Sequence, residues 1–106
     1  MPTSVQIGPY QFTVADDQIA HDRQTAQDGS RAWGTISYRY QRIILDPEQS
    51  EQHKRVTLLH EIMHGCEDLS DWRHDKTEEV IRMLAAPLLD VLRRNPDLVA
   101  YLTAEA

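Results

Sequence analysis

Apolar and polar residues alternate along the first part of the chain, which is typical of β-strands with one buried face. The alternation covers residues 5–7 and 10–14, and Gly8 and Pro9 stand between these two runs. A Gly-Pro pair between two alternating segments predicts a short hairpin or a bent strand.

A second alternation places Ile36, Tyr38 and Tyr40 on one face, and residues 43–45 (IIL) form a β-branched and apolar run shortly afterwards. A tight turn near residues 39–41 would pair these two segments as strands. We expect residues 34–37 to lie at an exposed edge of the sheet, where an extended peptide could add as a further strand.

Helical spacing dominates the second half of the chain. Asp46 and Pro47 predict a helix start, with Asp46 as the cap, and the helix is expected to run to about Glu67. A polar loop then precedes a second long helix, in which Pro87 predicts a kink. Shorter helices are expected over residues 16–26 and 97–102. Strands followed by helices predict a single α+β domain spanning residues 1–106.

The composition excludes several classes of protein. Lys and Arg total 11 and Asp and Glu total 17, and the resulting net charge of −6 argues against direct binding of nucleic acid. A single cysteine excludes an intramolecular disulfide. No basic start precedes an apolar run, and no stretch reaches the roughly 18 apolar residues of a membrane span. We therefore expect a cytoplasmic protein that does not bind membranes.

The sequence His60-Glu61-Ile62-Met63-His64 has the form HExxH. Residues four apart share one face of a helix, so His60 and His64 can bind the same metal ion, for which Zn²⁺ is the expectation. Glu61 lies about 100° further round the helix. It is therefore placed to act as a general base that takes a proton from the attacking water.

A catalytic zinc usually has three protein ligands, so a third must be found. The extended HExxHxxGxxH motif is excluded, because Glu67 and Ser70 occupy its glycine and last histidine positions. Glu78 and Glu79 begin the next predicted helix. Glu78 shares the phase of the apolar stripe that includes Ile81, and a carboxylate on such a stripe is costly unless it is paired or bound to a metal. Glu78 is therefore the predicted third ligand, with Glu79 as the alternative.

Three segments of the chain resemble the small ImmA/IrrE-type metallopeptidases, including the short versions found in phages and mobile elements. The segments are residues 42–45 (RIIL), 57–64 (TLLHEIMH) and 78–85 (EEVIRMLA). In that family a strand precedes the HExxH helix, and a later helix supplies a glutamate. The resemblance extends from about Arg42 to Leu89, a little under half of the chain.

The resemblance implies a minimal zincin-like fold, in which a small antiparallel sheet packs on the HExxH helix and on a second long helix. It implies a zinc-dependent peptidase acting on a protein or peptide substrate. His60, His64 and Glu78 would hold the metal, and Glu61 would be the general base.

Two other functions fit the same sequence. One is a non-catalytic binding module of phage or mobile-element origin, in which the metal only stabilises the fold. The other is a metal-free helical interaction domain. Among the remaining candidate residues, we expect His21 and His53 at the surface, Cys66 as a small buried residue, and His74 in a capping or solvent-exposed position.

Overall fold

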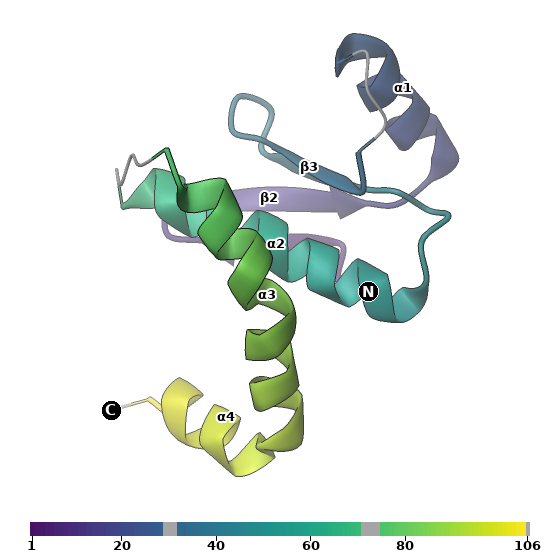
Figure 1. Cartoon of the computed structure of the whole chain (residues 1–106). Helices are drawn as coiled ribbons and strands as arrows, with labels where there is room; N and C mark the ends of the chain where they lie inside the picture. The colour runs from purple at the N-terminus through teal and green to yellow at the C-terminus, as the bar shows by residue number, and fades with distance from the viewer. Residues whose placement is uncertain (29–31, 71–74, 106) are drawn as a thin grey trace.

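Figure 1 shows the computed structural model, in which four strands form one sheet and the helices pack around it and extend from it. The structure describes residues 1–28, 32–70 and 75–105. The predicted α+β class is confirmed. The elements in chain order are β1 (Ser4–Ile7), β2 (Tyr10–Ala15), α1 (Gln18–Asp28), β3 (Gly34–Ser37), β4 (Arg42–Leu45), α2 (Glu51–Leu69), α3 (Thr77–Arg94) and α4 (Pro96–Thr103).

The sheet has the order β1-β2-β4-β3 and is mixed, so the expectation of an antiparallel sheet was wrong. The β1–β2 hairpin and the β3–β4 hairpin are both antiparallel, as their short turns require. The inner strands β2 and β4 pair in parallel, with Val14 opposite Ile43. Their parallel direction follows from the chain order, because α1 and β3 carry the chain back before β4 enters beside β2.

The core lies between the sheet and α2. Five buried strand residues form it, and Leu58 and Ile62 of α2 pack against them; the five are Ile7, Phe12, Val14, Ile43 and Leu45. Ile44 points to the opposite face and is also buried, where α1 contacts β4. The apolar run of β4 is therefore continuous because the strand is covered on both faces.

The helix that carries the HExxH motif begins later than predicted. Ser50 is its N-cap, and its hydroxyl oxygen accepts a hydrogen bond from the His53 amide at 3.1 Å. Asp46 instead accepts a bond from the amide of Glu48 at 2.9 Å, two residues on, which closes a local turn. The Gln49 side chain donates to the carbonyl of Trp33 at 2.9 Å, so this turn is fastened to the segment that precedes β3.

The first half of α3 packs on α2, where Ile81 and Ala85 are buried. The helix continues through Pro87 to Arg94 and extends away from the sheet, and α4 turns off at its end (Figure 1). Asn95 ends α3, and Pro96 begins α4. Within the described residues, none of the helices combines the length and the apolar character that a membrane crossing requires.

Candidate metal centre

Two histidines project from the same face of α2, as their spacing of four requires. The ring centroids of His60 and His64 lie 5.0 Å apart, with 61° between the ring planes. Both side chains are about four-fifths buried. The buried residue Gly65 follows the motif on α2, and a Cβ there would lie 2.7 Å from Cδ1 of Ile7. This glycine therefore lets the motif helix approach the sheet closely.

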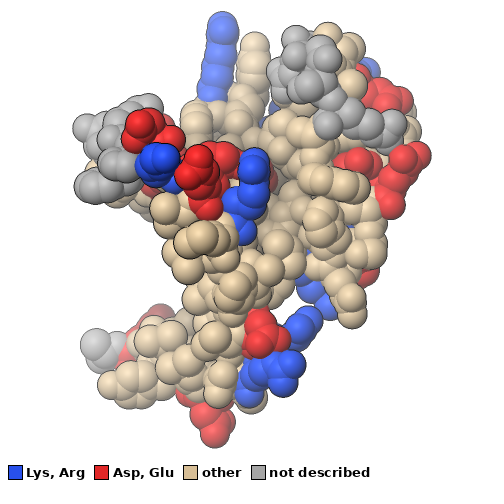
Figure 2. Space-filling model, in the orientation of Figure 1, with Lys and Arg blue, Asp and Glu red and all other residues tan. Residues whose placement is uncertain are grey.

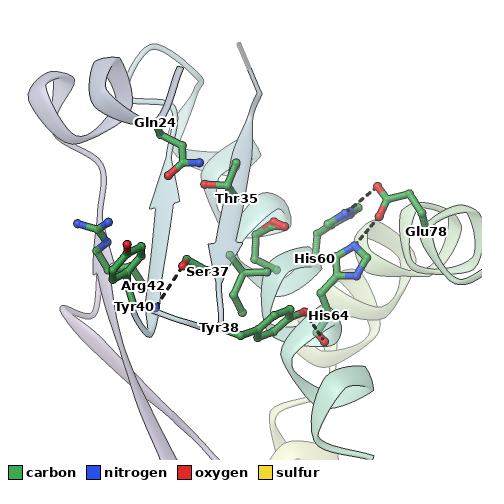
Figure 3. A pocket seen from close by; sticks show the side chains of 12 residues that line it. Gln24, Thr35, Ser37, Tyr38, Tyr40, Arg42, His60, His64 and Glu78 are labelled. Atoms are coloured by element: carbon green, nitrogen blue, oxygen red, sulfur yellow. Dashed lines mark hydrogen bonds and ion pairs between the residues drawn. The ribbon is translucent and has the colours of Figure 1, made fainter. Parts of the chain in front are cut away.

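Glu78 completes the cluster from α3. Its Oε1 lies 3.2 Å from Nε2 of His60, and its Oε2 contacts Nε2 of His64. One ligand atom from each of these three residues lies within 4.8 Å of the others. Figure 3 shows the two imidazoles and the carboxylate pointing toward one another across the gap between the two helices. Two imidazole nitrogens and one carboxylate oxygen converge here, which is a donor set that zinc accepts.

The alternative ligand, Glu79, points elsewhere. Its side chain is 70% exposed and lies 3.9 Å from Nζ of Lys76. Glu78 is itself 47% exposed and also accepts a contact from Arg82 at 3.3 Å. Glu78 therefore points toward the histidines, as its position on the same side of α3 as Ile81 predicted. The beginning of α3 is nevertheless not buried.

Glu61 lies on the sheet side of α2 and is only 5% exposed. Burial raises the pKa of Glu61 from 4.5 to about 7; the nearby Glu78 also raises it, and His64 opposes the change. Among the described residues the Glu61 carboxylate has no hydrogen-bond partner, and it lines the hollow beside the two histidines. A carboxylate with these properties is suited to exchange protons near neutral pH.

The surroundings of His60 favour its neutral form. Burial lowers the pKa of His60, and His64 adds to this effect, while Glu78 acts in the opposite direction. A neutral imidazole keeps a lone pair on one ring nitrogen, and metal binding requires that lone pair.

Two contacts to His64 were not anticipated from the sequence. Oε1 of Glu67 lies 3.5 Å from Nδ1 of His64, the ring nitrogen that faces away from Glu78. The hydroxyl of Tyr38 donates to the backbone carbonyl of His64 at 3.0 Å. In metal sites, a carboxylate commonly orients a metal-binding histidine by accepting a hydrogen bond from its other ring nitrogen. The spacing of three between His64 and Glu67 on one helix was the signal that could have identified this contact.

Two hollows meet at the cluster. One has a volume of about 610 Å³ and runs along β3, and the other has a volume of about 580 Å³ and extends toward Trp33 and Arg82. His60, Glu61, Glu78 and Gly34 line both.

Strand β3 is an edge strand, as expected, and forms one wall of the first hollow. A Cβ at Gly34 would lie 2.5 Å from Cγ2 of Thr57 and 3.4 Å from Cγ of Glu61. The absence of a side chain at this position is what allows β3 to lie directly against the motif helix.

The other candidate residues take different positions. His21 is 3% exposed, so the expectation that it lies at the surface was wrong; its Nε2 donates to the carbonyl of Ala32 at 3.0 Å. His53 is exposed as expected, with its ring edge-on to Trp33. Cys66 is exposed, so the expectation that it is buried was wrong. His74 lies outside the described residues.

Comparison with known proteins assigns no family to the chain. No protein-family model, no curated protein and no solved structure matches it. The likeness to the ImmA/IrrE-type metallopeptidases therefore rests on the motif residues themselves, and the function has to be argued from the geometry of the site.

Proposed function

We propose that this protein is a zinc-dependent metallopeptidase that hydrolyses peptide bonds of a protein substrate. One observation carries the proposal: His60, His64 and Glu78 bring three ligand atoms within 4.8 Å of one another, from two different helices. Next to them lies Glu61, a buried carboxylate whose pKa is raised to about 7. A metal site with an acid–base group at its side is the arrangement that metal-assisted hydrolysis needs.

His60, His64 and Glu78 would hold the metal, because two imidazoles and one carboxylate form a known catalytic zinc set that leaves a further position open. When bound, zinc acidifies a coordinated water and polarises the carbonyl group under attack. Glu67 would keep the ring of His64 oriented toward the metal through its contact with Nδ1.

Glu61 would act twice in one turnover. It first takes a proton from the water whose oxygen attacks the peptide carbonyl carbon. It then delivers that proton to the amine nitrogen as the carbon–nitrogen bond breaks. Burial favours the protonated form of Glu61, which helps the side chain to hold the proton between the two steps.

The shape of the site favours catalysis over a purely structural metal. Structural zinc sites are closed by four protein ligands, whereas here Glu78 is half exposed and two hollows open beside the cluster. A peptide substrate needs space on both sides of its scissile bond. The edge strand β3 beside the cluster offers unpaired backbone groups to which an extended chain can add.

The alternative is a binding module in which the metal only stabilises the fold. It would use the same three metal-binding residues but would give Glu61 no role. Hydrolysis needs an acid–base group beside the metal, and Glu61 lines the hollow at that place, which favours the catalytic proposal.

The test combines zinc content with hydrolysis of a mixed peptide library. Glu78→Ala should lose zinc, whereas the matched variant Glu79→Ala should keep it, because its side chain points away from the histidines. Glu61→Gln should keep zinc and lose cleavage by at least about 100-fold.

Each failure has a distinct meaning. Zinc bound equally by wild type and Glu78→Ala would show that the site is misassigned. Zinc-loaded wild type and Glu61→Gln that are equally inactive on all peptides would favour the binding module. Wild type that binds no added zinc would favour the metal-free interaction domain.

A further inference from the structure

The outer face of α3 is strongly apolar and exposed. Five large side chains on it have exposed fractions between 39% and 70%, namely Val80, Met83, Leu84, Leu88 and Val91. Their spacings of three and four residues place them along one side of the helix. On α4, Leu98, Tyr101 and Leu102 are also exposed, by 39% to 80%. We call these eight residues the α3–α4 apolar surface.

Contacts with the rest of the described chain do not cover this surface. Only Ile81 and Ala85 of α3 are buried, and α4 has no buried residue. Figure 2 shows an uncharged area over α3 and α4, between charged groups near the start of α3 and others at the corner between the two helices. Apolar patches of this size on soluble proteins mark interaction sites.

The area matches what a protein dimer requires. Eight large side chains exposed by about half leave on the order of 600 Å² of apolar surface. A stable interface of standard size takes about 800 Å² from each partner, and about two thirds of it is apolar in homodimers.

The charges at the two ends of α3 favour a second copy of this chain as the partner. The first turn carries Glu78 and Glu79, and the last turn carries Arg93 and Arg94. Glu79 and Arg94 are 15 residues apart, which places them about 60° from each other around the axis and on the same side of the apolar stripe. In an antiparallel pair related by a twofold axis, Glu79 of one copy lies beside Arg94 of the other, twice in each dimer.

We propose that this protein forms a homodimer in which the α3 helices of two copies pack antiparallel through the α3–α4 apolar surface. Arg94 already contacts Asp90 at 2.9 Å, and Glu79 lies 3.9 Å from Lys76. The Glu79–Arg94 contacts between copies therefore join two existing pairs into one network of alternating charges. Oppositely directed helix dipoles favour the same arrangement.

The first test is the oligomeric state of the full chain by sedimentation velocity across micromolar concentrations. Wild type should sediment as a dimer of the 12.2 kDa chain. Leu84→Glu places a charge in the apolar stripe and should weaken dimerisation by at least about 100-fold. The control variant Gln52→Glu, at an exposed position near the start of α2, should stay dimeric.

A second test examines the antiparallel arrangement by reversing charges. Glu79→Arg and Arg94→Glu should each weaken dimerisation by about 5-fold or more, since each creates two repulsive contacts. An equal mixture of the two variants should regain the wild-type dissociation constant, because the mixed dimer has opposite charges at both contacts. If a substitution weakened dimerisation only by disturbing its own helix, the mixture would remain weak. Recovery of the affinity in the mixture therefore indicates that residues 79 and 94 interact between copies.

Several outcomes would overturn the proposal. The proposal is overturned if the wild-type chain remains monomeric, even if it binds lipid vesicles or another protein through this surface. It is also overturned by a Leu84→Glu variant that stays dimeric with unchanged affinity. A mixture of the charge-reversed variants as weak as its components would refute the antiparallel pairing.

Discussion

Replacing Glu61 with glutamine should stabilise the metal-free protein at neutral and alkaline pH. The glutamate is 5% exposed and has no hydrogen-bond partner among the described residues. Glutamine has nearly the same size and shape but carries no charge. The substitution therefore removes the cost of a buried negative charge while keeping the packing against β3.

The size of the effect follows from the pKa of Glu61, which rises from 4.5 to about 7 in the folded protein. Between these values the unfolded chain has lost the proton and the folded chain still holds it, so the stability of wild type falls as pH rises. The loss is complete above pH 7 and amounts to about 3 kcal/mol. The advantage of Glu61→Gln should therefore grow from about 1 kcal/mol at pH 5 to about 3 kcal/mol at pH 8.5.

The assay is urea unfolding of both proteins from pH 5 to 8.5 with a chelator present, so that no metal contributes. Glu105→Gln, at an exposed position near the end of the chain, is the matched control and should change stability by less than about 0.5 kcal/mol throughout. A difference between wild type and Glu61→Gln that stays constant across this pH range would refute the reasoning, because it would mean that burial does not perturb the ionisation of Glu61.

Three further substitutions test the construction of the site. Gly34→Ala places a Cβ 2.5 Å from Cγ2 of Thr57 and should lower the free energy of unfolding by about 1 to 3 kcal/mol in urea titrations; an unchanged midpoint would contradict the close approach of β3. Ser50→Ala removes the cap of α2 and should cost about 1 kcal/mol in the same titrations. Glu67→Ala should weaken zinc binding by about 10-fold in competition with a chromophoric chelator, since it frees the ring of His64.

Local sequence patterns predicted the parts of the site that lie within one helix. The spacing of four placed His60 and His64 together, and the apolar phase of α3 directed Glu78, rather than Glu79, toward them. These placements could be predicted because helical geometry relates neighbouring positions without reference to the rest of the fold.

Features that depend on distant parts of the chain were not predictable in this way. Alternation identified the strands but not the parallel pairing of β2 with β4, which depends on where α1 carries the chain. His21 is buried, and its ring contacts the carbonyl of Ala32, 11 residues further along the chain. The start of α2 was misplaced because Asp46 and Ser50 are both good capping residues, and tertiary contacts of the turn between them decide which one caps the helix.

Because Glu78 lies on α3 and both histidines lie on α2, metal binding would depend on the position of α3. α3 is held on α2 by the buried side chains of Ile81 and Ala85, and beyond them it extends away from the sheet. A metal shared by α2 and α3 would fasten the two helices across a separation of only 14 residues, from His64 to Glu78. By thermodynamic reciprocity, a partner that steadies α3 would tighten metal binding, and a bound metal would tighten the binding of that partner by the same factor.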